Sequence, residues 1–201
     1  MLTMCPTKPE AFPLYYAAML GFRDLAEHLI AEHPDHVNAQ GGREVTPMHA
    51  AARAGHVDIL SLLLDNGAEV DGRGIIGQTL LHRASWNGTL EAGKRLLDRG
   101  ADVNARMTMV PPHCFQRRTM ENVDFVGMLL KHGARINVQD DTGETPLHWA
   151  VRHRKIQSTR LLLEHGADVN VRDNDGRTPS ELGSLLSFHD IVKVLSAESV
   201  K

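Results

Sequence analysis

The sequence predicts an all-α solenoid, a stack of helix–turn–helix units with hairpin-like loops projecting between them. The first observation is a fixed period: glycine recurs at Gly67, Gly100, Gly133 and Gly166, and each step has the same length, about 33 residues. The second is a recurrent opening. Its clearest copy is Thr145-Pro146-Leu147-His148, and Pro146 precedes Gly166 by the same interval by which Pro47 precedes Gly67. This pattern is typical of units that bury their apolar faces by stacking on one another.

The copy at residues 140–172 shows why each unit should contain two helices. Thr145 is a good N-cap, and Pro146 then occupies the first helical position, where its missing N–H is not needed. The run Leu161-Leu162-Leu163 is expected to carry a second helix into the core. Gly166 is expected to end that helix in the left-handed conformation that glycine adopts without strain.

Six units are expected in order along the chain. In the first, Tyr15 replaces the histidine of the opening, and in the last, Ser180 and Glu181 replace leucine and histidine. Polar substitutions of this kind suit a terminal unit with a wetted outer face. The units cover residues 7–40, 41–73, 74–106, 107–139, 140–172 and 173–201, so 7–201 is predicted to be a single domain after a short N-terminal extension, 1–6.

The fourth unit, 107–139, is degenerate in its first half. The interval that separates Pro146 from Gly166, counted back from Gly133, places the proline position on His113. Aligning Pro111 instead makes the helical part longer. Neither alignment restores the opening. We expect a distorted first helix around Pro111–Arg118, with Phe115 filling the core.

The paired openings and endings resemble those of ankyrin-repeat proteins, over about residues 10 to 197. The resemblance implies a curved stack in which the short first helices line a concave face that binds protein partners. It implies a non-catalytic protein–protein interaction scaffold or adaptor. The alternative is a targeting or regulatory fragment of a larger signalling or sensor protein; an enzyme or a nucleic-acid binder is a third, weaker hypothesis.

Composition and charge restrict the other classes. The net charge of −3 gives no basic field for nucleic acid or an anionic membrane. No apolar run approaches the length of about 18 residues that a membrane span needs, and the N-terminus does not look like a secretory signal. Two cysteines, Cys5 and Cys114, cannot build a disulfide framework. We therefore expect a monomer in the cytoplasm or nucleus, with a protein partner and no cofactor.

Several motifs that could carry chemistry have a structural explanation. His49, His82 and His148 recur once per unit, about 10 Å apart, too far to share a metal whose bonds are about 2 Å long. The hypothesis is that each bonds its threonine and the next loop. Asp141-Thr142-Gly143 matches an aspartic-protease tripeptide, and Asp173-Asn174-Asp175-Gly176 faintly resembles a calcium loop, but turn chemistry accounts for both.

Two further motifs stay open between a structural and a functional interpretation. Cys114, beside His113, aligns with a core leucine and is expected to be a buried small hydrophobe rather than a reactive thiol. Arg152-His153-Arg154-Lys155, with Arg117-Arg118, forms a basic neighbourhood. It is either a solvated face or a docking site for an acidic segment. No catalytic, cofactor or metal residues are predicted.

The third unit departs most from the repeat at its surface. Ile75 and Ile76 stand where other units place polar turn residues, and Trp86 stands where they place arginine. Such a set has the composition of an interface hot spot, although these side chains could instead pack on one another. Loop tips and first-helix ends are predicted to contact the partner: Arg43, Arg53, Ile75, Ile76, Gln78, Trp86, Asn87, Glu144, Arg152 and His153.

Overall fold

The computed structural model describes residues 12–41, 46–74, 77–105 and 122–198, and every described element is helical. The chain separates into two compact units, Met1–Met109 (unit 1) and Val110–Lys201 (unit 2). The predicted all-helical repeat fold is confirmed. The expectation that 7–201 acts as a single domain stays a prediction, and so does the distorted helix at Pro111–Arg118, which lies outside the described residues.

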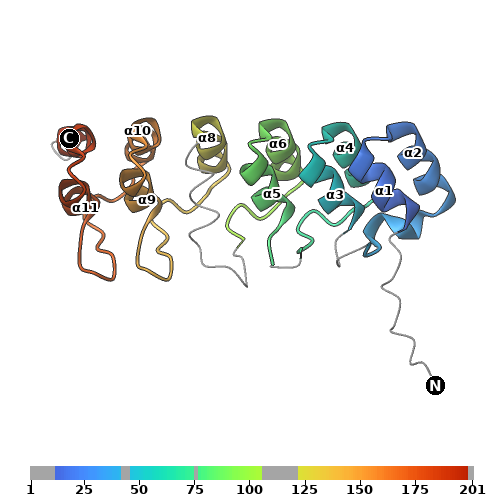
Figure 1. Cartoon of the computed structure of the whole chain (residues 1–201), viewed down its shortest axis with the longest axis horizontal. Coiled ribbons are helices and arrows are strands. Elements are labelled where there is room, and N and C mark those ends of the chain that lie inside the picture. The colour runs from blue at the N-terminus through green and yellow to red at the C-terminus, as the bar shows by residue number, and fades with distance from the viewer. Residues whose placement is uncertain (1–11, 42–45, 75–76, 106–121, 199–201) are drawn as a thin grey trace, which may run out of the picture. The chain divides into compact units, whose positions relative to one another are not determined.

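Unit 1 is built from pairs of short helices in two rows (Figure 1). Each first helix packs on the first helix of the next pair, and the second helices do the same, so side chains between neighbouring pairs form a continuous core. The first helices are α1 (Pro13–Leu20), α3 (Pro47–Ala54) and α5 (Leu80–Asn87); the second helices are α2 (Arg23–Glu32), α4 (Val57–Asp65) and α6 (Leu90–Asp98), with a 3₁₀ turn, η1 (Pro34–Asn38), after α2.

Unit 2 repeats this arrangement. Its second helices α8, α10 and α12 pack in sequence, and the first helices α9 and α11 pack on each other, with loops projecting from one edge (Figure 1). The bounds are α8 Val123–Lys131, α9 Pro146–Arg152, α10 Ile156–Glu164, α11 Pro179–Leu185 and α12 His189–Glu198.

The helix signals in the sequence are confirmed in α9 and α10. The Thr145 hydroxyl accepts the His148 N–H at 3.4 Å, and His148 Nδ1 accepts the Thr145 N–H at 3.2 Å. Because Nδ1 is an acceptor here, Nε2 carries the proton and donates to the carbonyl of Arg177 in the next loop at 3.0 Å. The histidine thus caps its own helix and ties two repeats together. Gly166 has a φ of +86° after α10, as predicted.

The core of unit 2 lies between the two helix rows. Leu147 and Leu162 are completely or almost completely buried there, together with Ile191 from the last repeat. Leu161 and Leu163 are only partly buried, so the predicted leucine run contributes one central core residue flanked by two at its margin. None of the described helices is long and apolar enough to cross a membrane.

The first repeat leaves an apolar edge exposed. Tyr16, Leu20, Phe22 and Leu25 on or beside α1 and α2 are between 46% and 55% exposed. In the next repeat, Ile59 occupies the position of Leu25 (25 + 34) and is completely buried. In the last repeat, Thr178 and Glu181 form a capping box at the start of α11 with Glu181 exposed, while Leu185 at the end of that helix is 65% exposed.

Candidate protein-binding surfaces

In unit 1, three side chains from two adjacent first helices form one surface, which we call the Trp86 surface: Arg53, Arg83 and Trp86. Arg53 lies in the last turn of α3 and is exposed. Arg83 lies in the first turn of α5, with its guanidinium carbon 5.5 Å from the centroid of the Trp86 ring. This is a cation–π distance. Both Arg83 and Trp86 are partly exposed, so the three side chains present cationic and aromatic groups together.

Asn87 links the two helices that carry the Trp86 surface. Its side-chain amide donates to the carbonyls of Ala52 and Arg53 in the preceding repeat, at 3.0 Å each. These bonds satisfy carbonyls at the C-terminal end of α3 that have no partner within the helix. Asn87 is exposed as predicted, but its amide holds α5 against α3 and so fixes where Arg53 and Trp86 lie.

Positive charge accumulates around the Trp86 surface. Burial lowers the pKa of Arg83, and the neighbouring charge of Arg53 lowers it further. Burial also lowers the pKa of His49 to about 4, with a further contribution from Arg83. Burial likewise lowers the pKa of His82 to about 4, with a further contribution from the charge of Arg73. Both histidines are therefore neutral at physiological pH, and the positive charge belongs to the arginines.

Two of the predicted contact residues are buried instead. Gln78 is 1% exposed, and its backbone carbonyl accepts the N–H of Gly74 at 2.8 Å to close the loop. Glu144 is 3% exposed. Both side chains therefore offer almost no surface to a partner. Ile75, Ile76 and Arg43 lie outside the described residues, so their predicted role stays a prediction.

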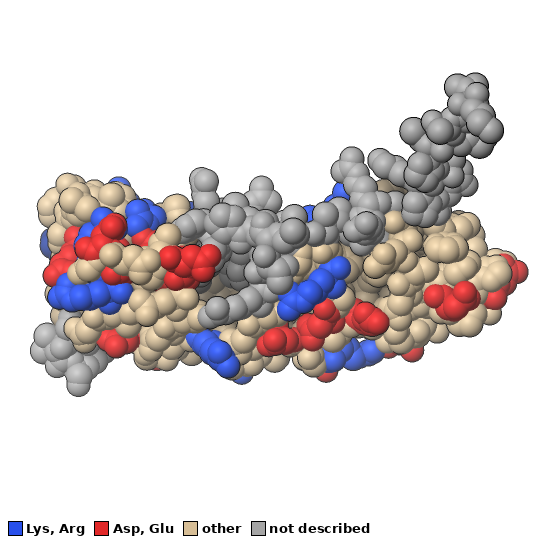
Figure 2. All heavy atoms as spheres, turned by 90° about the horizontal axis from the view of Figure 1, so that it is seen from below, with Lys and Arg blue, Asp and Glu red and all other residues tan. Residues whose placement is uncertain are grey.

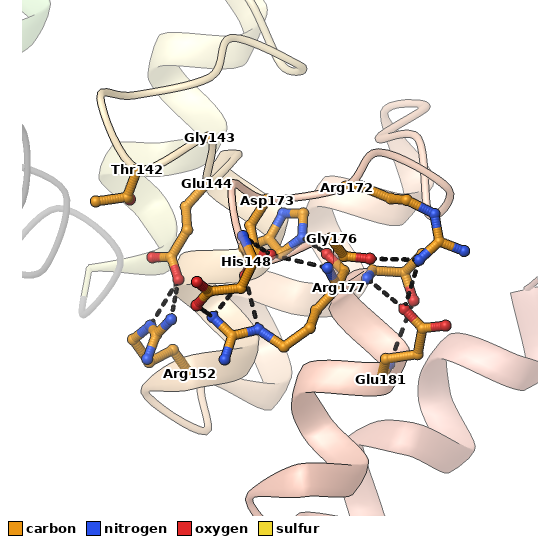
Figure 3. Close-up of polar contacts among 12 residues, drawn as sticks. Thr142, Gly143, Glu144, His148, Arg152, Arg172, Asp173, Gly176, Arg177 and Glu181 are labelled. Carbon is orange, nitrogen blue, oxygen red and sulfur yellow. Dashed lines mark hydrogen bonds and ion pairs between the residues drawn. The ribbon is translucent and has the colours of Figure 1, made fainter.

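In unit 2, the arginine at the repeat position of Trp86 is paired with a carboxylate of its own loop. Arg152, at the end of α9, donates from Nε to the buried Glu144 carboxylate at 2.8 Å and forms an ion pair with it (Figure 3). Arg154 pairs with Asp190 at 3.0 Å. The basic run from Arg152 to Lys155 is therefore largely compensated by acidic side chains. Its second part, Arg117-Arg118, lies outside the described residues.

His153 packs on an aromatic neighbour rather than standing alone. Its ring stacks on Trp149 with centroids 4.9 Å apart and an interplanar angle of 27°. Trp149 in turn donates from Nε1 to Asp140 at 2.9 Å. Burial alone would raise the pKa of Asp140, but hydrogen bonds from Thr142, Trp149 and backbone N–H groups outweigh it and leave that pKa lowered. The carboxylate is a fixed anchor of its loop.

The tripeptide at 141–143 and the loop at 173–176 serve as turns. Asp140 accepts the N–H groups of Thr142 and Glu144 at 2.8 and 3.0 Å, and Gly143 has a φ of +74°. One repeat later, Asp173 accepts the N–H groups of Asp175 and Arg177 at 3.0 and 2.8 Å (Figure 3). In each loop, one carboxylate oxygen accepts two backbone N–H groups of that loop, as in an Asx turn. His113 and Cys114 lie outside the described residues.

Arg83 belongs to the Trp86 surface, but the sequence analysis did not predict it as a contact residue. It occupies the position of Ala50 in the preceding repeat (83 − 33) and of Trp149 two repeats later (149 − 66). Both of those side chains are buried, at 3% and 4% exposure. An arginine at a position that otherwise takes a buried apolar side chain was the available signal.

Comparison with known proteins gives one consistent result. A family model described as ankyrin repeats (3 copies) matches residues 14–107 and 117–201. Alpha-latrocrustotoxin-Lt1a of Latrodectus tredecimguttatus is 39% identical over 62 residues, covering 31% of this chain and 4% of the toxin. The ankyrin repeat and KH domain-containing protein mask of Drosophila melanogaster is 40% identical over 58 residues, 29% of this chain and 1% of that protein. The chain thus spans a few per cent of these relatives.

Two solved structures match nearly the whole chain. An ankyrin repeat domain from Acinetobacter baumannii AYE has a TM-score of 0.84 and 25% identity, covering 93% of this chain and 97% of that one. A chain from the complex of the predatory endopeptidase Bd0816 of Bdellovibrio bacteriovorus with immunity protein Bd3460 has a TM-score of 0.82 and 25% identity, covering 94% and 98%.

Proposed function

Because the chain belongs to the ankyrin-repeat family, we propose that it is a non-catalytic scaffold or adaptor that binds a protein partner through its first helices and loop tips. Ankyrin repeats generally mediate protein–protein interaction, and one similar structure comes from an endopeptidase–immunity protein complex. The observation that carries the proposal is the Trp86 surface, where a partly exposed tryptophan lies beside two arginines. Tryptophan and arginine are enriched among the residues that dominate binding energy at protein interfaces.

Three carboxylates in the loops of unit 2 support a binding role over catalysis. Among the described residues, the buried carboxylates of Glu144 and Asp173 each pair with an arginine, and Asp140 is fixed by its own loop. A catalytic acid or base needs a proton that it can exchange with a substrate. These groups instead stabilise loops.

On the face seen in Figure 2, the acidic and basic side chains of the described residues are interspersed and form no continuous basic stripe. This distribution supports a protein partner over nucleic acid, as does the net charge of −3. A cytoplasmic or nuclear location and a monomeric state are part of the proposal.

The second candidate function is a targeting or regulatory segment of a larger protein. It is favoured by the relatives, in which the matching segment makes up 4% of alpha-latrocrustotoxin-Lt1a and 1% of mask. Both candidates use the same kind of binding surface, so the same experiment addresses them.

The test is an affinity pulldown from cell extract with the wild-type chain and Trp86→Ala, followed by identification of the retained proteins. We expect Trp86→Ala to reduce retention of the specific partner at least about tenfold, the size of a hot-spot truncation, with little change in melting temperature. Arg95→Glu is the control for a surface substitution away from this site, since Arg95 lies on the second-helix row and pairs with Glu91 at 3.1 Å. Equal loss of stability and binding in Trp86→Ala would assign Trp86 to packing and contradict the proposal.

A further inference from the structure

Four arginines of unit 1 differ in whether they meet a carboxylate. Arg95 on α6 pairs with Glu91 at 3.1 Å, and Arg99, directly after α6, pairs with Asp65 of the preceding repeat. On the first helices, Arg53 and Arg83 make no ion pair with any carboxylate among the described residues. The positive charge of the first-helix row is therefore not compensated within the part of unit 1 that the structure describes.

The repeat register shows which residues are responsible. In unit 2, the loop before α9 supplies two carboxylates, Asp140 to Trp149 and Glu144 to Arg152. Two periods earlier, the same loop positions hold Gly74 (140 − 66) and Gln78 (144 − 66). Both are uncharged. The loop that neutralises its own arginine in unit 2 thus has no carboxylate at either position in unit 1.

The arginines of the Trp86 surface also repel each other. The charge of Arg53 acts on Arg83 strongly enough to lower the pKa of Arg83, in addition to the effect of burial. Two like charges held close together cost free energy, and an anion placed between them removes that cost. The surface is thus electrostatically arranged to receive negative charge.

The contact with Trp86 leaves the arginine able to bind such an anion. The guanidinium of Arg83 lies 5.5 Å from the ring centroid, so it meets the ring through its π-face. A guanidinium that stacks on an aromatic ring keeps its in-plane N–H groups for other acceptors, and these form a fork that matches a carboxylate. Trp86 itself is partly exposed and offers apolar area next to the charged groups.

We propose that the Trp86 surface, formed by Arg53, Arg83 and Trp86, binds an acidic peptide segment of the protein partner. Aspartate or glutamate side chains of the segment pair with the two arginines, and an apolar side chain between them packs on Trp86. This proposal rests on the proposed function, since it names the chemistry of the partner at that surface. It also moves the acidic docking site from Arg152, which is paired with Glu144, to unit 1.

The test uses two short fluorescein-labelled peptides, one of glutamates around two central leucines and one in which glutamine replaces every glutamate. Fluorescence anisotropy should show that the glutamate peptide binds and the glutamine peptide does not, and that binding weakens as salt rises from about 50 to about 200 mM. Charge reversal in Arg53→Glu/Arg83→Glu should weaken binding at least about tenfold. Arg95→Glu should leave it unchanged.

The neutral variant Arg53→Gln/Arg83→Gln removes both positive charges without introducing negative ones. We expect it to lose peptide binding while its circular dichroism spectrum stays that of the wild type, which shows that the loss does not come from unfolding. Equal binding of both peptides, no binding of either, or wild-type affinity in both double variants would overturn the acidic-segment proposal. Tighter binding of a single-stranded oligonucleotide of equal charge would overturn it in favour of nucleic acid. If the peptides fail while the pulldown still depends on Trp86, only the acidic chemistry is refuted; if both fail, the binding surface itself is refuted.

Discussion

Acidification should destabilise unit 1 before unit 2, because two buried histidines of unit 1 resist protonation. Burial lowers the pKa of both His49 and His82 from 6.5 to about 4. In the unfolded chain these rings take up a proton as the pH falls below 6.5, whereas in the folded chain they stay neutral until about pH 4. The unfolded state therefore binds more protons across this window. Stability is complete above the unfolded pKa and declines as the pH falls toward the folded one.

The size of the effect follows from the pKa difference. Each pKa unit corresponds to about 1.4 kcal/mol, so at pH 5, about 1.5 units below the unfolded pKa, each histidine costs roughly 2 kcal/mol of unfolding free energy. Two independent histidines cost roughly 4 kcal/mol. The carboxylates with lowered pKa all belong to unit 2: Asp140, Asp173 and Asp190, whose ordinary value is 3.8, and Glu181, whose ordinary value is 4.5. Their contributions are lost only at lower pH.

Hydrogen exchange with mass spectrometry shows which unit loses stability on acidification. The measurement is made at about pH 7 and about pH 5 and corrected for the intrinsic exchange rate. Peptides from α3 to α6 should lose protection, and peptides from α9 to α12 should keep it. In His49→Asn/His82→Asn, which keeps an acceptor near each capping threonine, the dependence on pH should flatten. Equal loss in both units, or unchanged protection of α3 and α5 at pH 5, would refute the reasoning.

Three further predictions test the packing. Arg152→Ala leaves Glu144 buried without its arginine and should cost about 2–4 kcal/mol in urea unfolding; adding Glu144→Gln should recover most of that loss, and no recovery would count against the pair. Gly143→Ala should cost over about 2 kcal/mol, since φ is +74° and the added carbon meets the next loop at 2.5 Å; Gly166→Ala, at +86° with open space, should cost about 1. Leu25→Ala, at 46% exposure, should cost under about 1 kcal/mol, and a larger loss would mean that this edge is covered.

The local features of this chain were predictable because they depend on residues close in sequence. Thr145, Pro146 and Gly166 fix the ends of their helices through backbone conformations that few other residues supply, and the structure places each as expected. The repeat period then sets which helices are neighbours. Helix pairs and their order follow from these short-range rules.

The pairing of polar side chains across the loops was not predictable in the same way. Glu144 was expected at the surface because its repeat position lies in a loop predicted to contact the partner, but it is 3% exposed and bound to Arg152 of the following helix. Whether a loop carboxylate turns inward depends on the arginine that the next helix directs toward it. The repeat register alone shows that Gly74 and Gln78 stand where unit 2 has Asp140 and Glu144, but only the structure shows that those two carboxylates are bound by Trp149 and Arg152.

The most direct test of the binding surface uses the two tryptophans, one in each unit: Trp86 and Trp149. Each gives one indole N–H signal in a ¹H–¹⁵N correlation spectrum, and Trp149 is held by Asp140 at 2.9 Å. Titration with the glutamate peptide should shift the Trp86 indole signal and the Arg83 side-chain Nε–H signal, and should leave the Trp149 indole signal in place. A shift of Trp149 alone, or no shift of Trp86 at saturating peptide, would contradict the account.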